Sequence, residues 1–389
     1  MNATSDPAAP STGITLSDLP SAPRPLDDAA FEEIARSLSQ AAVVGIGEST
    51  RFARETFEVR DRVFRILVQW YGFRAVALQD SADVAAVLDH FVLTGEGTAQ
   101  AALDTAWRPW RTAETAAALE WIRDFNREHG ADPVRIIAVK PAQANSADYD
   151  VVLDAVRRIA PDRLAEISAH LEPIRSAHTT DEHVQRARGI HPGRAFQEDA
   201  RDAAALLNSL AGVPEDVRSR MRLIVDFHER SVAGRGSFVG DEDLWGAAMI
   251  DYQTRTGRRI VYWDGIAHSS ALATGSGDHP TAGSALRQHY GAQYASVAIG
   301  FHHGDLGIVD VPAPPADFLD AVLGAAEPAA HWVDLRGHDG ALGAVKMRVI
   351  SGVYDPANDA AAHLMFADLP AAFDVLVHVR EASALRWLP

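Results

Sequence analysis

Short, almost uninterrupted apolar runs alternate with amphipathic helical patterns along the first part of the chain. AVVGIG (42–47), RAVALQ (74–79) and VRIIAV (134–139) have the length and the apolar character of strands that are buried on both faces. Residues at helical spacing fill the segments between them. Since parallel strands need long crossover connections, this alternation predicts an α/β fold with a mostly parallel sheet covered by helices on both faces.

The strand signal also divides the chain. Residues 146–257 carry almost none and are typical of four or five helices, which predicts a large helical insertion or subdomain. Residues 1–24 are rich in Pro, Ala, Ser and Thr and predict a flexible N-terminal tail. We therefore expect an α/β core formed by residues 25–145 and 258–389, with the helical insertion roofing the crevice at the edge of the sheet.

Charge and cysteine content narrow the function. The chain has 36 Lys and Arg against 53 Asp and Glu, a formal net charge of −17, and no cysteine. A field of that sign repels phosphate backbones and anionic lipids, so we expect a small-molecule partner rather than nucleic acid or a membrane. The absence of cysteine excludes disulfides and thiolate chemistry. With no signal-peptide pattern and no apolar run of ~18 residues, we expect a cytoplasmic protein. The oligomeric state is left open.

Two further strands are predicted at RRIVYW (258–263) and YASVAIGF (294–301). Polar residues follow each of these five predicted strands, where an open parallel sheet binds its ligands. The candidates are Glu48 and Arg51, Gln79 and Asp80, Lys140, Asp264 and His268, and His302. Any one of them could instead begin a solvated loop, and Arg51 with Glu55 could form a surface helix pair. His302 and His303 are adjacent and a poor pair of metal ligands, because neighbouring residues of a strand point to opposite faces. No phosphate-binding loop, zinc helix or nucleophile elbow is present, so we expect no metal and no cofactor.

Several segments resemble the erythromycin esterase family. They include VVGIGESTRFARETFEVRDRVFRIL, RRIVYWDGIAHSSAL, AGSALRQHYGAQYASVAIGF and HWVDLR, in the family's order over roughly residues 26–385. The resemblance implies the family's fold. It also implies a G-E-x-x-H segment whose histidine is the general base that activates water to cleave a macrolactone ester. A glutamate of that segment, a helix arginine, a second glutamate and two later histidines complete the site that the resemblance implies.

This sequence departs from that pattern at several positions. The positions that keep the family's residue are Glu48, Arg60 and His268. The positions that differ are Arg51 in place of the general-base histidine, Gln79 in place of the second glutamate, Lys140 in place of an aspartate, and Gly265 in place of the first of the later histidines. Arginine has no lone pair available near neutral pH, and losing a general base typically costs ~10² to 10⁴ in rate. We therefore expect the family's hydrolysis to be weak or absent.

The added cations Arg51 and Lys140, together with Arg60, predict a pocket that is more positive and suits a carboxylate, an enolate or a developing oxyanion. Our first hypothesis is an enzyme that tailors a natural-product metabolite of polyketide or peptide type by hydrolysis, cyclisation, elimination or isomerisation. Glu48 or His268 would be the acid or base, and Arg51 would stabilise negative charge. The substrate-binding candidates are Gln79, Asp80, Lys140, Asp264 and His302. The alternatives are a non-catalytic metabolite-binding or self-resistance protein on the same scaffold, and a structural relic.

Overall fold

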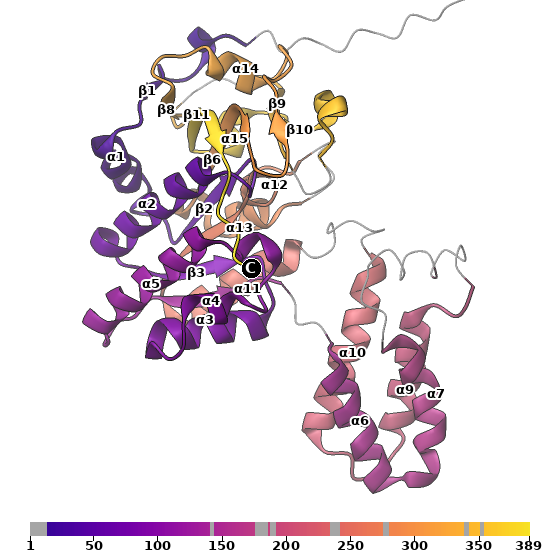
Figure 1. Ribbon diagram of the computed structural model, residues 1–389. Helices are drawn as coiled ribbons and strands as arrows, with labels where there is room; N and C mark the ends of the chain where they lie inside the picture. The colour runs from indigo at the N-terminus through magenta and orange to yellow at the C-terminus, as the bar shows by residue number, and fades with distance from the viewer. Residues whose placement is uncertain are drawn as a thin grey trace, which may run out of the picture. The chain divides into compact units, whose positions relative to one another are not determined.

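The computed structural model describes residues 14–140, 144–175, 186, 192–233, 242–274, 280–337, 342–350 and 354–389. The chain forms two compact units, one made of Met1–Val139 with Glu242–Pro389 and the other of Lys140–Asp241 (Figure 1). Each unit has its own hydrophobic core.

A central sheet runs through the larger unit in the order β1-β8-β11-β6-β2-β5-β3-β4, with β7 paired to β6. Its strands are β1 (Arg24–Pro25), β2 (Val43–Glu48), β3 (Phe73–Leu78), β4 (Arg135–Ala138), β5 (Arg259–Gly265), β6 (Tyr294–Asp305), β7 (Asp310–Val311), β8 (Ala330–Asp334) and β11 (Val375–Ser383). All neighbours from β11 to β4 are parallel, whereas β1, β7 and β8 pair antiparallel. The predicted mostly parallel sheet is confirmed.

Helices cover both faces of this sheet. One face carries α1 (Asp28–Leu38), α2 (Arg54–Tyr71), α3 (Ala82–Thr94), α4 (Ala99–Leu103) and α5 (Ala113–Glu128). The other carries α11 (Glu242–Thr256), α12 (Ile266–Ser269), α13 (Ala282–Tyr290), α14 (Leu319–Gly324) and α15 (Leu369–Ala372). In β2, Val44 and Ile46 join the apolar core of the first group, while Val43 joins that of Trp245 on α11. Alternate side chains of β2 therefore pack into the hydrophobic cores on the two opposite faces of the sheet.

Local sequence signals set the ends of these helices. The side chains of Asp27, Ser81 and Thr112 accept backbone N–H groups at the first turns of α1, α3 and α5. Gly72 and Gly95 end α2 and α3 in the left-handed conformation, at φ 69° and 74°. These are the residue types that such ends favour.

Three further features complete the larger unit. β9 (Val345–Arg348) and β10 (His363–Phe366) form a separate antiparallel pair. The sequence predicts a longer strand through residue 354, of which residues 351–353 lie outside the described residues. Residues 1–13 of the predicted tail also lie outside them. Within the rest of that tail, Leu19 is buried in the apolar core beside α14 and α15, because this stretch does supply an apolar side chain.

The smaller unit is helical. It contains α6 (Ser146–Ile159), α7 (Leu164–Ile174), α9 (Phe196–Asn208) and α10 (Glu215–Ala233), and its described residues include no strand. The buried Tyr149 hydroxyl and His228 Nε2 are 2.7 Å apart in its core. The predicted role of this segment as a roof over the crevice stays a prediction. Short 3-10 turns lie at η1 (Leu16–Asp18), η2 (Arg108–Trp110), η3 (Pro161–Arg163), η5 (Gly291–Gln293) and η6 (Pro356–Ala361).

Candidate active site

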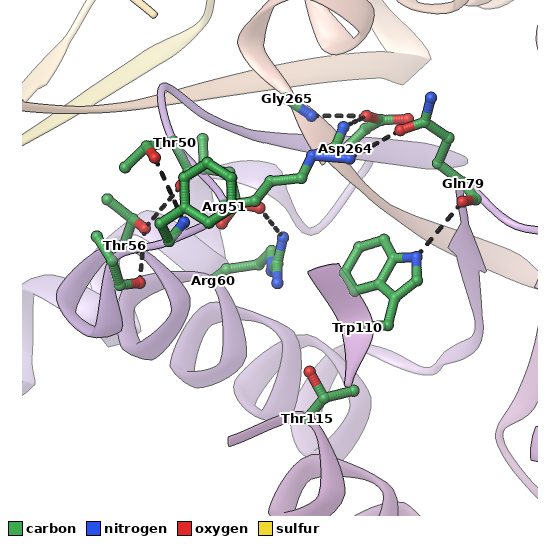
Figure 2. Close-up of polar contacts among 12 residues, drawn as sticks. Thr50, Arg51, Thr56, Arg60, Gln79, Trp110, Thr115, Asp264 and Gly265 are labelled. Carbon is green, nitrogen blue, oxygen red and sulfur yellow. Dashed lines mark hydrogen bonds and ion pairs between the residues drawn. The ribbon is translucent and has the colours of Figure 1, made fainter. Parts of the chain in front are cut away.

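The carboxyl ends of three neighbouring strands meet in the larger unit. β2 pairs with β5, placing Glu48 opposite Gly265, and β5 pairs with β3, which ends just before Gln79. Contacts between the side chains at these ends define a group that we call the site cluster: Glu48, Arg51, Arg60, Gln79, Asp264 and His268. Figure 2 shows most of this cluster.

A buried ion pair joins β2 to α2. Arg60 Nη1 lies 2.7 Å from Glu48 Oε1, and both side chains are almost fully buried. The guanidinium lies over the rings of Phe57, Trp110 and Trp263, at 4.9, 5.3 and 4.7 Å from their centroids. Burial raises the pKa of Glu48, although Arg60 acts against that rise. Three aromatic rings and the Glu48 carboxylate therefore surround the guanidinium. Separating Arg60 from Glu48 would leave a buried charge without its partner.

Arg51 lies in the short loop between β2 and α2. The Thr56 hydroxyl, which donates to the Thr50 carbonyl at 3.2 Å, fixes this loop. Arg51 donates from Nη1 to Gln79 Oε1 at 2.7 Å and from Nη2 to Asp264 Oδ1 (Figure 2). Arg51 is therefore a cation that is bound to two neighbouring side chains.

Asp264 is the anionic centre of the cluster. Its fully buried carboxylate accepts hydrogen bonds from Arg51, from the Tyr262 hydroxyl and from the Gly265 N–H, the last at 2.7 Å. Burial by itself would raise the pKa of Asp264, but the charges of Arg51 and His268 outweigh it and lower that pKa. Asp264 is therefore ionised at neutral pH and matches the charge of Arg51.

Each of the two arginines in the site cluster is paired with a carboxylate, which limits the positive charge that the sequence predicts for this pocket. Arg51 is matched by Asp264, and Arg60 is matched by Glu48. The added positive charge of Arg51 is thus offset inside the cluster. An anionic ligand would meet a guanidinium that already has an anionic partner.

His268 lies on α12, directly after β5. Its Nε2 is 3.9 Å from Asp264 Oδ1, and its Nδ1 is 3.0 Å from Oε1 of Glu242, the first residue of α11. The side chain is 18% exposed. Burial alone would lower the pKa of His268, but Asp264 and Glu242 outweigh it, with Arg51 opposing them, and the pKa is raised. The sequence did not single out Glu242, because its segment was assigned to the helical insertion and no local motif marks it.

Asp80 binds two backbone N–H groups in the loop after β3. Its Oδ2 accepts the Trp107 N–H at 2.7 Å, and its Oδ1 accepts the Ser81 N–H at 2.8 Å. The Arg51 guanidinium lies 4.7 Å from the centroid of the Trp107 ring, which is 37% exposed. Asp80 thus fixes the backbone of an aromatic residue beside Arg51, and its predicted role in binding substrate stays a prediction.

Lys140 and His302 are the two remaining predicted residues. Lys140 is the first residue of the helical unit, and its predicted part in the site stays a prediction. His302, near the end of β6, has its Nδ1 2.9 Å from His303 Nδ1, and its carbonyl accepts from Arg348 at 2.5 Å. Within the described chain no such contact links His302 to Arg51 or His268, and its binding role also stays a prediction.

Gly265 leaves room at the centre of the cluster. A Cβ atom placed on it would lie 3.5 Å from Arg51 Nη2 and 3.8 Å from His268 Cδ2, which are ordinary van der Waals distances. A longer side chain at this position would start between those two residues. No group of three or more His, Asp or Glu side chains in the described part of the chain is arranged to hold a metal ion.

Comparisons with known proteins place this geometry in context. The model of the family described as erythromycin esterase matches residues 68–382. Similar solved structures include a protein from Bacillus cereus, at 20% identity and TM-score 0.65, and a succinoglycan biosynthesis protein, at 19% and 0.65, each over 93% of both chains. A mutant of the erythromycin esterase EreC in its open conformation matches at 16% identity and TM-score 0.59, over 95% of this chain and 97% of that one. No protein with a curated description matches. At these identities the likeness shows the fold.

Among the helices of the described chain, none is long and apolar enough to cross a membrane.

Proposed function

The chain belongs to the erythromycin esterase family, and from this premise we propose that it is an enzyme that transforms a natural-product metabolite of polyketide or peptide type by acid–base chemistry. His268 is the proton-transferring residue. Arg51 stabilises negative charge that develops on the substrate. The reaction class is hydrolysis, cyclisation, elimination or isomerisation, each of which needs an acid and a base.

One observation carries this proposal. In the site cluster Glu48 is paired with Arg60, and Asp264 with Arg51, so these charges are committed to each other. His268 is the partly exposed titratable member, and its Nε2 lies at the edge of the cluster near Asp264. Asp264 and Glu242 raise the pKa of His268 against the effect of burial, and imidazole is the side chain that most often transfers protons in catalysis. His268 can therefore give a proton and take one back within a single turnover.

Arg51 supports this chemistry without transferring a proton. Its guanidinium is fixed by Gln79 and Asp264, and so needs little reorganisation when negative charge develops nearby. As a base, His268 would take a proton from water or from a carbon acid. As an acid, it would return that proton to the departing oxygen. Glu48 binds Arg60 and does not transfer protons, because its carboxylate accepts a hydrogen bond from that guanidinium.

The test replaces His268 by Asn and follows turnover of erythromycin and of a panel of p-nitrophenyl esters, by chromatography with mass spectrometry and by absorbance. We expect the variant to lose ~10² to 10⁴ in kcat on any probe that the native protein turns over. His90→Asn is the matched control, since His90 also contacts a glutamate, Glu96 at 3.1 Å, but is 59% exposed. Native turnover in the His268→Asn variant would contradict the proposal.

The alternative function is a metabolite-binding or self-resistance protein. The observation in its favour is that Arg51, which stands where the resemblance places the general base, has no proton-accepting lone pair and is bound to Gln79 and Asp264. Stoichiometric capture of a probe that is recovered chemically unchanged, with no turnover of any ester, would favour this alternative over the enzyme.

A further inference from the structure

We infer that Glu242 is a positioning residue for His268: its carboxylate holds the imidazole with the proton on Nδ1, so that Nε2 faces the site cluster. This inference deepens the proposed function and rests on it for the role of His268. Glu242 would act through the histidine and would not touch the substrate.

The contacts of Glu242 fix its carboxylate at both oxygens. Oε1 lies 3.0 Å from His268 Nδ1, and Oε2 accepts the backbone N–H of Ala282, the first residue of α13, at 3.1 Å. The Glu242 side chain is only 12% exposed. A single carboxylate thus joins α11, α12 and α13, and its orientation is set by the backbone of α13 as well as by the histidine.

His268 has no competing partner for that nitrogen. In the part of the chain that the structure describes, Nδ1 makes no hydrogen bond, and the Glu242 carboxylate lies 3.0 Å from it as an ion-pair partner. The ring of Trp245, which lies on α11 and is fully buried, has its centroid 5.2 Å from that of His268. Helix α11 therefore supplies both a carboxylate beside Nδ1 and an aromatic ring that restricts rotation of the imidazole.

The charged neighbours of His268 come from three elements. Glu242 on α11 and Asp264 on β5 raise the pKa of the imidazole against the effect of burial, while Arg51 in the loop after β2 lowers it. A carboxylate on one ring nitrogen fixes the tautomer and increases the basicity of the other. With the Glu242 carboxylate beside Nδ1, Nε2 is the nitrogen that faces Asp264, 3.9 Å away, and it is the one that would exchange a proton.

The experiment replaces Glu242 by Gln, which keeps the size of the side chain and one acceptor for Ala282 but removes the charge. Histidine-labelled protein is titrated by NMR, which reports the pKa and the tautomer of His268 without any substrate. The pH–rate profile is recorded on the ester probes. We expect the pKa of His268 to fall, the share of the Nδ1–H tautomer to drop, the acid limb of the profile to move to lower pH, and turnover to fall by roughly tenfold.

Two further variants serve as a control and as an intermediate case. Glu96→Gln is the matched control, because Glu96 contacts His90 at the same kind of distance, 3.1 Å, on the exposed surface; it should leave the His268 titration and the turnover as in the native protein. Glu242→Asp keeps the charge but shortens the reach, so His268 should titrate between the native and Gln values. If the Gln variant does not fold, the comparison of Glu242→Asp with the native protein carries the test.

The outcomes separate this inference from the proposed function. An unchanged titration and tautomer of His268 in Glu242→Gln would overturn the inference, and so would a changed titration that leaves the pH–rate profile where it was. Full activity of His268→Asn would instead overturn the proposed function, whatever the NMR titration shows.

Discussion

Two buried polar clusters in the larger unit respond to burial in opposite ways. One is the site cluster. The other, which we call the His378 cluster, consists of Asp320, His331, Arg348 and His378. Asp264 in the first and Asp320 in the second are both fully buried, yet the pKa of Asp264 is lowered while burial raises that of Asp320 to about 7.

The partners explain the difference. Asp264 has a guanidinium and two hydrogen-bond donors. Asp320 Oδ2 accepts the backbone N–H of Arg348 at 2.7 Å, but its Oδ1 makes no hydrogen bond within the described chain and lies 3.7 Å from His378 Nε2. The Arg348 guanidinium, which lowers the pKa of Asp320, is paired with Asp359 instead. Burial penalises the charged form of both carboxyls, and only a matched cation offsets the penalty.

The two histidines repeat the contrast. His268 lies between the carboxylates of Glu242 and Asp264, and its pKa is raised. His378 is fully buried, neither of its ring nitrogens makes a hydrogen bond among the described residues, and burial, together with His331, lowers its pKa far below the ordinary value. The neighbours of His268 therefore favour its charged form, whereas burial and His331 favour the neutral form of His378. The comparison teaches that partners, more than depth, decide which buried groups keep a charge.

The largest expected effect comes from breaking the strongest pair of the site cluster. Arg60→Met would leave Glu48 buried without its cation, and we expect a loss of about 3–5 kcal/mol in the free energy of unfolding. Urea denaturation measures this loss. The double variant with Glu48→Gln should recover most of it. A double variant that costs as much as the sum of the two single changes would contradict the pairing.

A control for that prediction lies in the helical unit. Arg222 contacts Glu215 at 2.6 Å, with both side chains more than half exposed. Arg222→Met should cost under about 1 kcal/mol, because solvent screens exposed pairs.

Asp320→Asn should act in the opposite direction and depend on pH. The folded pKa of about 7 lies above the ordinary value for an aspartate, so the native protein loses stability as pH rises from about 4 through 7. Asn cannot ionise and avoids this loss. We expect the variant to be more stable than the native protein by about 2–3 kcal/mol at pH 8, and by less at pH 5. Urea denaturation at the two pH values measures the gap, and a gap of equal size at both would refute the assignment.

Arg51→Met would make the site cluster more like the His378 cluster. Asp264 would keep the Tyr262 hydroxyl and the Gly265 N–H as partners, so we expect a loss of only about 2 kcal/mol. Removing a nearby positive charge should also raise the pKa of His268 further, which an NMR titration measures. A His268 that titrates as in the native protein would show that Arg51 does not act on it.

The smallest effect is expected at His378. Replacing it by Leu removes an imidazole that makes no hydrogen bond in the described chain, so the free energy of unfolding at pH 8 should change by less than about 1 kcal/mol. A loss of several kcal/mol in the free energy of unfolding would contradict this, because it would mean that the imidazole of His378 makes a stabilising polar interaction.

Much of the fold and part of the site follow from local sequence. The alternation of apolar runs and helices predicted the sheet, and the rule that ligands bind beyond strand ends singled out Glu48, Gln79 and Asp264, which the fold brings together. β9 lies within a longer strand that the sequence predicts, but its antiparallel partner β10 was not predicted, because a short strand is decided by the partner that it meets. Glu242 was missed for a related reason: its contact with His268 joins elements far apart in the chain.

The sequence by itself predicted the family and the mostly parallel sheet, and both are confirmed. That Arg51 replaces the family's general-base histidine stays a prediction. The tertiary structure alone decided that Arg51 is matched by Asp264, that Arg60 is enclosed by three aromatic rings, and that His268 faces Glu242. The physical reason is that periodicity and residue type are local properties, whereas the charge state of a buried group depends on partners that strand register and helix packing deliver.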